Sequence, residues 1–127
     1  MRVRELMQKD VKTVDPEAAV NDVVVSLSDS HISALAVVDG TGRMVGVISS
    51  TDILTSEAEA QDAVEREALF EQMTVRDIMT RRPLTVSPDA DVREAAQQML
   101  YADIHRLFVT SDEQVVGVIS TTDIMRA

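Results

Sequence analysis

Two serine–aspartate pairs in this chain share the same spacing and the same setting. Ser49 precedes Asp52, and Ser120 precedes Asp123, in each case directly after a Gly-Val-Ile run typical of a strand. This pattern places a carboxylate and backbone N–H groups at a helix start, which attracts phosphate. The carboxylate can also accept both hydroxyls of a ribose diol. The spacing equally matches a capping box, in which the two side chains only begin the helix. Both interpretations stay open, and the two roles can coexist.

The second pair has a neighbouring cation that the first pair lacks. His105 and Arg106 come just before a predicted strand, where the aligned positions of the first half carry Ser33 and Ala34. Arginine suits phosphate because its planar fork pairs with two oxygens and keeps its charge. The alternative is that both residues belong to the surface, with Arg106 paired to one of many carboxylates. If they are functional, the second half holds a complete phosphate site, and the first half a weaker or empty one.

An internal duplication positions both pairs. The segment Val3–Met7 returns as Val75–Met79, and Gly46–Ile53 returns as Gly117–Ile124. A repeat of this length is one supersecondary unit used twice, and such units usually complete each other's core.

The elements of each half can be predicted from spacing. Asp15-Pro16-Glu17 and Ser87-Pro88-Asp89 are typical helix starts, with proline at the first helical position. Apolar runs separated by turn residues then predict a two-stranded hairpin. Each half is therefore a short strand, a helix, a hairpin and a second helix. We expect an α/β fold with repeats at 1–54 and 73–127, joined by a Glu- and Ala-rich helical connector at 55–72.

Composition excludes several classes of function. The net charge of −10 leaves no basic face for a nucleic acid, and an aromatic content of 2% excludes base-stacking platforms. The chain has no cysteine, and its apolar runs are too short to span a membrane. The charged first residues leave no room for a signal peptide, so we expect a cytoplasmic protein. No nucleophile elbow, glycine-rich phosphate loop or metal-ligand pattern is present, so an enzyme is not expected.

The repeated Gly-hydrophobic-hydrophobic-Ser-x-x-Asp pattern, preceded by Asp-Pro or Ser-Pro, resembles the cystathionine-β-synthase (CBS) domain. Two in tandem resemble a Bateman module. The resemblance implies two βαββα units related by a pseudo-twofold axis and packed through their sheets, with ligand clefts between them. It places the family's ribose-binding aspartate on Asp52 and Asp123. It also implies further ligand-binding residues, namely Ser49, Thr51, Ser120, Thr122, His105 and Arg106, with an adenine slot at Val86 and Ile104 and at Val14 and Ile32. From the bare sequence, these four apolar residues are simply core.

The function implied is regulatory sensing of an adenine nucleotide (AMP, ADP or ATP) in the cleft between the repeats, without a cofactor or a bound metal. The alternatives are a sensor of S-adenosylmethionine or another adenosyl ligand, and a ligand-free dimerisation scaffold. The resemblance further implies a homodimer. Because no effector domain is present in this sequence, the regulated protein is expected to be another, unknown chain. Neither a nucleic acid nor a membrane is expected as a partner.

Overall fold

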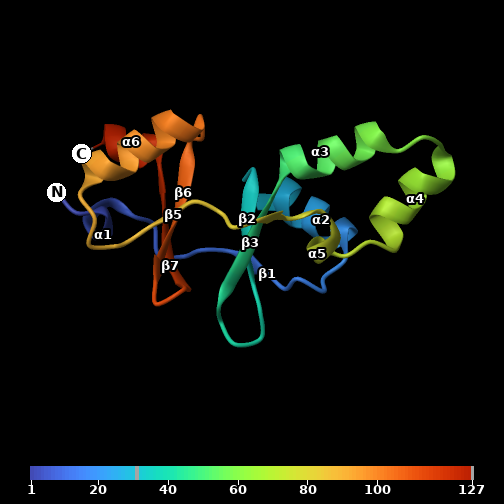
Figure 1. The fold of residues 1–127 in the computed structure, drawn as a ribbon, viewed down its shortest axis with the longest axis horizontal. Helices are drawn as coiled ribbons and strands as arrows, with labels where there is room; N and C mark the ends of the chain where they lie inside the picture. Colours follow the sequence, from blue (N-terminus) through green and yellow to red (C-terminus); the bar gives the residue numbers. More distant parts are fainter. Residues whose placement is uncertain (31, 127) are drawn as a thin grey trace. The chain divides into compact units, whose positions relative to one another are not determined.

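Each repeat contributes its first short helix to the elements of the other repeat (Figure 1). The structure is a computed structural model and describes residues 1–30 and 32–126. It divides into two units. We call residues 1–11 together with residues from 84 onward the N/C unit, and residues 12–83 the central unit.

Both units contain the predicted order of strand, helix, hairpin and helix. The elements of the central unit are β1 (Thr13–Val14), α2 (Val20–Ser30), β2 (Ala34–Val38), β3 (Met44–Ser49), α3 (Ser50–Glu59), α4 (Ala63–Glu71), α5 (Val75–Ile78) and β4 (Thr80–Arg81). The elements of the N/C unit are α1 (Val3–Leu6), β5 (Thr85–Val86), α6 (Val92–Ala102), β6 (Arg106–Ser111), β7 (Gln114–Ser120) and α7 (Thr121–Met125). The predicted βαββα units are thus confirmed, and α3 and α4 make the segment between the repeats largely helical.

The two sheets follow one plan. In the central unit the strand order is β1-β2-β3-β4, with β1 parallel to β2 and the other pairs antiparallel. In the N/C unit the order is β5-β6-β7, again with a parallel first pair and an antiparallel second pair. In the N/C unit Gln8 forms a β-bridge with Val118 of β7. The equivalent pair in the central unit is Thr80 of β4 with Val47 of β3. In both units, therefore, the segment after the first short helix of one repeat lies along the hairpin of the other repeat.

The long helices begin later than the proline motifs predicted. Pro16 and Glu17 lie in a turn, where an Asp15 side-chain oxygen accepts the Glu17 N–H at 2.8 Å, and α2 begins only at Val20. In the second repeat α6 begins at Val92. The predicted helix starts at Asp15 and Ser87 are therefore wrong.

The reason is that the carbonyl groups of these turns hold the exchanged short helices. The carbonyl oxygens of Pro88 and Ala90 accept the backbone N–H groups of Arg4 and Val3, both at 2.9 Å. Pro16 and Ala18 accept Arg76 and Val75 in the same way, at 2.8 and 2.9 Å. A helix through the proline turns would direct these carbonyls along its own axis, leaving the first N–H groups of the short helices without partners.

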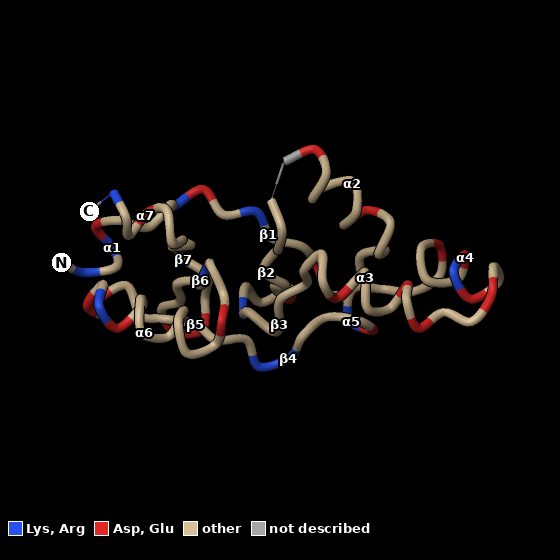
Figure 2. The backbone as a smooth tube through the Cα atoms, turned by 90° about the horizontal axis from the view of Figure 1, so that it is seen from above, with Lys and Arg blue, Asp and Glu red and all other residues tan. Residues whose placement is uncertain are grey.

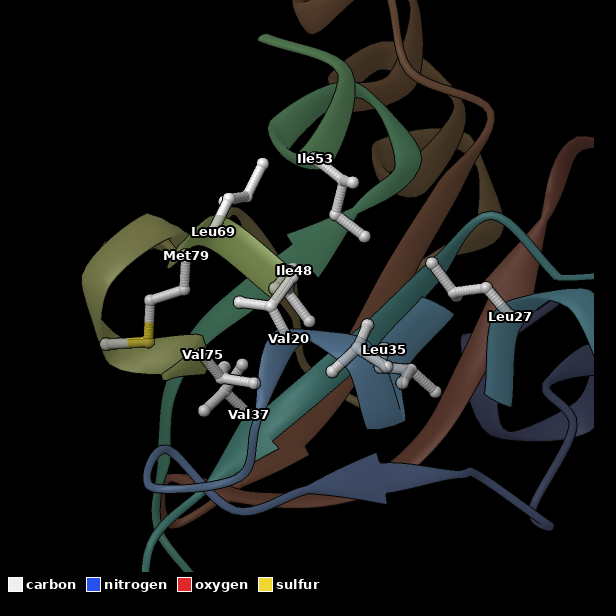
Figure 3. Close-up of a cluster of buried hydrophobic side chains, with 10 residues drawn as sticks. Val20, Leu27, Leu35, Val37, Ile48, Ile53, Leu69, Val75 and Met79 are labelled. Atoms are coloured by element: carbon white, nitrogen blue, oxygen red, sulfur yellow. The ribbon is translucent and has the colours of Figure 1, made fainter. Parts of the chain in front are cut away.

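Each unit has its own apolar core. Figure 3 shows that the core of the central unit gathers side chains from α2, β2, β3, α3, α4 and α5, including Leu35, Ile48 and Val75. The N/C unit buries Val3, Val86, Ala95, Met99, Leu107, Val109 and Ile119. Val3 and Val75, from the exchanged short helices, are both fully buried. Exchange of the short helices is therefore part of what holds each core together.

The glycine that begins each Gly-Val-Ile-Ser run is required by this exchange. A Cβ on Gly117 would lie 2.9 Å from the carbonyl oxygen of Gln8, and one on Gly46 would lie 2.8 Å from that of Thr80. Both distances are shorter than any ordinary van der Waals contact. Only glycine therefore lets the segment that follows the short helix of the other repeat approach the hairpin this closely.

Figure 2 shows acidic residues on helices and loops of both units, with a basic stretch at β4. Within the described ranges, the structure contains no helix with the length and apolar character needed to cross a membrane.

Candidate functional site

Both serine–aspartate pairs form capping boxes. Asp52 accepts the backbone N–H of Ser49 at 2.9 Å and its hydroxyl at 3.0 Å, both on Oδ2. Asp123 accepts the same two groups of Ser120 at 2.8 and 2.9 Å, also on Oδ2. Each serine hydroxyl in turn accepts the backbone N–H of its aspartate. The capping interpretation is therefore confirmed for α3 and α7, and one carboxylate oxygen of each pair is engaged in it.

The other carboxylate oxygen is held by the exchanged segment of the other repeat. Thr80 donates its hydroxyl to Asp52 Oδ1 at 2.9 Å. Gln8 donates its side-chain amide to Asp123 Oδ1 at 3.0 Å. Sequence reasoning missed both donors, although each directly follows the methionine that ends a repeated segment, Met7 or Met79. Their equivalence in the repeat was a signal that could have found them.

Asp123 is the buried charge of the N/C unit. It is 7% exposed and is the only buried charged or polar residue among the described residues. Burial raises the pKa of its carboxyl group, but the hydrogen bonds from Gln8 and Ser120 and the positive charge of Arg126 together outweigh burial, so the pKa lies below its ordinary value. The carboxylate is thus held ionised and ready to accept hydrogen bonds at neutral pH.

This lowered pKa predicts acid sensitivity. Because Asp123 binds its proton more weakly when folded than when unfolded, its ionised form stabilises the fold above its unfolded pKa, and this stabilisation is lost as pH falls through the folded pKa. In urea titrations, wild type should exceed Asp123→Asn in stability at pH 7, and the gap should close below about pH 4. A gap that stays constant down to pH 2 would contradict this account.

Two arginines of the N/C unit lie near the Ser120–Asp123 capping box, one beside each residue of the pair. Arg106 of β6 stands directly opposite Ser120 of β7 in the antiparallel register, so their side chains share a face of the sheet. Arg126, just after α7, is near enough for its charge to lower the Asp123 pKa. Arg106 was a candidate from the sequence, whereas Arg126 was not considered there.

The central unit has no such cation at either position. Ala34 stands opposite Ser49 in β2 and β3, as Arg106 stands opposite Ser120. Thr55 takes the place of Arg126 when the repeated Asp52 and Asp123 segments are aligned. The strand register therefore agrees with the sequence comparison, which aligned Ser33-Ala34 with His105-Arg106.

The remaining predicted residues divide between the units. In the N/C unit, His105 and Thr122 are exposed, Val86 is buried, and Ile104 packs against the core. The backbone carbonyl oxygen of His105 accepts the backbone N–H of Thr121 at 2.9 Å. The imidazole side chain takes no part in this hydrogen bond. In the central unit, Thr51 is exposed, and Val14 and Ile32 pack at the edge of the core. Each unit thus carries one capped aspartate and its own set of these predicted residues.

The CBS domain family matches residues 3–59 and 75–127, so this chain belongs to the CBS domain family and carries two CBS domains.

The proteins that this chain resembles in sequence include both large enzymes and a small protein. The chain is 27% identical over 125 residues to a homoserine O-acetyltransferase of Methanohalobium evestigatum, covering 98% of this chain and 23% of that enzyme. An inosine-5′-monophosphate dehydrogenase of Methanocaldococcus jannaschii is likewise matched over only 22% of its length. An uncharacterized protein of the same organism is 26% identical over 153 residues, covering 100% of this chain and 90% of that protein. The matched region is a CBS pair, which is a regulatory module and not an enzyme.

Two solved structures share the fold and contain adenosine compounds. The CBS domain pair of protein MJ0100, in complex with 5′-methylthioadenosine and S-adenosyl-L-methionine, has a TM-score of 0.82 at 28% identity, covering 99% of this chain and 94% of that one. CBSX2 in complex with AMP has a TM-score of 0.84 at 26% identity, covering 98% and 93%. Adenosine-containing ligands thus occur in two structural neighbours of this chain.

Proposed function

We propose that this chain is a regulatory module that binds an adenine nucleotide (AMP, ADP or ATP) in its N/C unit. The observation that carries this proposal is the ionised carboxylate of Asp123 together with Arg106 across the hairpin and Arg126 nearby. A carboxylate and a pair of guanidinium groups match the two ends of a nucleoside phosphate, which are a diol and an anion. The occurrence of AMP in one structural neighbour supports this choice.

Each residue has a role in this proposal. Asp123 accepts the ribose hydroxyls, and Arg106 and Arg126 pair with phosphate oxygens. Thr122 and His105, which are exposed on either side of the hairpin end, complete the phosphate end. Ser120 keeps Asp123 in position through the capping box. The adenine ring lies against the partly buried Ile104, beside the core residue Val86.

The central unit suits a ligand without a phosphate. Asp52 offers the same carboxylate, supported by Ser49 and Thr51, but Ala34 and Thr55 stand where the N/C unit carries arginines. Val14 and Ile32 provide its apolar edge. An uncharged or cationic adenosyl compound is therefore the ligand that this unit would favour. Binding of S-adenosyl-L-methionine and 5′-methylthioadenosine by a structural neighbour supports this second possibility.

Calorimetric titration of AMP and adenosine tests the assignment. Asp123→Ala should weaken both ligands, because both carry the ribose. Arg106→Ala should weaken AMP roughly tenfold or more and leave adenosine nearly unchanged, since one charged hydrogen bond contributes about 1.5–3 kcal/mol. Asp52→Ala is the matched control and should change the Arg106-dependent affinity little.

The ligand-free alternative gives a different pattern. If the aspartates only cap helices, Asp52→Ala and Asp123→Ala would each cost about 1 kcal/mol of stability. Wild-type protein would then show no heat of AMP binding, and its melting temperature would not respond to any adenosine compound. Equal AMP affinity in wild type and Arg106→Ala would refute the phosphate role of Arg106.

A regulatory role also needs a reader of the bound state. We place this reader, an unidentified effector, on another part of the protein or on another chain in the cytoplasm. Assembly as a homodimer is part of the same proposal. It is supported by large apolar side chains that α6 and α7 leave exposed, namely Leu100, Tyr101 and Met125.

A further inference from the structure

Gln8 occupies an acceptor that the proposed ligand needs. Its side-chain nitrogen donates to Asp123 Oδ1 at 3.0 Å, while Oδ2 of the same carboxylate already accepts two hydrogen bonds from Ser120. A ribose diol would bring two hydroxyl donors to this one carboxylate. A carboxylate has about four acceptor positions. Three donors already use three of them, so about one position remains for the two hydroxyls of a diol, and the diol and the Gln8 amide compete.

Only the side chain of Gln8 is in a position to move aside. Its backbone N–H donates to the Val118 carbonyl at 2.8 Å, and its own carbonyl accepts the Val118 N–H at 2.9 Å. The side chain of the preceding Met7 lies against Gly117. The residue as a whole is exposed, so its flexible side chain has solvent into which it can turn. Release of Asp123 therefore requires a change of side-chain rotamer without opening of the sheet.

The equivalent residue in the central unit is of a different chemical type. Thr80 donates one hydroxyl to Asp52 Oδ1 at 2.9 Å, and that hydroxyl oxygen can still accept a hydrogen bond from a ligand. The amide nitrogen of Gln8 is a donor only. Thr80 can therefore join a hydrogen-bonded chain with a bound diol, whereas the Gln8 amide nitrogen has to be displaced from Asp123.

We propose that the Gln8 carboxamide is an internal stand-in for the ligand hydroxyl at Asp123, and that it makes the N/C unit selective for ligands whose anionic group offsets its displacement. This inference rests on the proposed function, because it assumes that Asp123 receives the ribose of the ligand. A nucleoside without phosphate has only its hydroxyls to exchange for the Gln8 amide. A nucleoside phosphate gains its contacts with Arg106 and Arg126 in addition, so it is the ligand that displaces Gln8.

The test compares wild type with Gln8→Ala, using AMP and 2′,3′-dideoxy-AMP in calorimetric titrations. Removing the competing amide should tighten AMP binding about three- to tenfold, because the hydroxyls no longer compete with a charge-assisted hydrogen bond. The dideoxy compound has no hydroxyl at these positions, so its affinity should stay the same. The matched control is Thr80→Ala, which removes the equivalent donor from Asp52 and should not tighten the Arg106-dependent binding of AMP.

A second measurement follows Gln8 itself in the wild type. Saturation with AMP should shift the side-chain amide resonances of Gln8 in a ¹⁵N-correlated spectrum toward those of a solvent-exposed carboxamide. Unchanged Gln8 resonances, or AMP binding by Gln8→Ala that is equal to or weaker than wild type, would overturn the inference while an Arg106-dependent AMP affinity left the proposed function intact. Absence of AMP binding in wild type and Gln8→Ala alike would overturn both.

Discussion

Replacing Gly117 with alanine is expected to destabilise the N/C unit by about 1–3 kcal/mol or more, the range found when an extra methyl group is forced into a packed site. The new Cβ would lie 2.6 Å from the Met7 sulfur and 2.9 Å from the Gln8 carbonyl oxygen. The methionine side chain can turn away. The carbonyl oxygen has less freedom, because it accepts the Val118 N–H at 2.9 Å. The strain therefore has to separate the exchanged segment from the hairpin.

Urea denaturation provides the measurement and the chain provides two comparisons. Gly46→Ala should behave like Gly117→Ala, since its Cβ would lie 2.8 Å from both the Met79 sulfur and the Thr80 carbonyl oxygen. Gly40→Ala is the control, because nothing lies within 4 Å of a Cβ at that turn position. If Gly117→Ala were as stable as Gly40→Ala, the close approach of the two segments would not be what requires glycine.

Element types and their order could be predicted from sequence because they depend on local patterns. The Ala34–Val38 run and its hairpin partner are separated by turn residues, and in the structure these residues form the predicted turn. The Asp39 side chain accepts the backbone N–H groups of Thr41 and Arg43 at 2.9 and 3.1 Å, and Gly42 adopts a positive φ of 88°. The shorter hairpin turn likewise places Asp112 and Glu113 at positive φ, as a two-residue turn of type I′ requires.

The helix starts were wrong because a long-range partner decides them. Asp-Pro-Glu is a good local signal for a helix, and nothing nearby in the sequence opposes it. The competing element is a short helix more than fifty residues away, whose N–H groups need the carbonyls of Pro16 and Ala18. A local pattern contains no information about such a partner.

The candidate site shows the same division. Asp52 and Asp123 could be found because their capping serines are three residues away. Gln8 and Thr80 reach them from the opposite repeat, at separations of 115 and 28 residues along the chain. Arg126 acts through its charge alone, without a motif. Gln8, Thr80 and Arg126 contribute to the chemical difference between the two units, and a local sequence pattern points to none of them. Arg106 is the exception, because it stands beside a repeated strand.

Exchange of the short helices predicts that a core mutation in one repeat will loosen the other. Val3→Ala and Val75→Ala each delete a fully buried side chain and should each cost about 2 kcal/mol, from two buried methylene equivalents and the cavity that remains. Val3 belongs to the core that contains Leu107 and Ile119, and Val75 to the core that contains Leu35 and Ile48.

Amide hydrogen exchange can locate the effect of each change. Val3→Ala should speed exchange in β6 and β7, which are far away in sequence, and Val75→Ala should do so in β2 and β3. Val64→Ala is the control, because Val64 is 74% exposed and its removal should change stability by less than about 0.5 kcal/mol. The opposite pattern, with Val3→Ala loosening β2 and β3 first, would mean that each short helix packs within its own repeat.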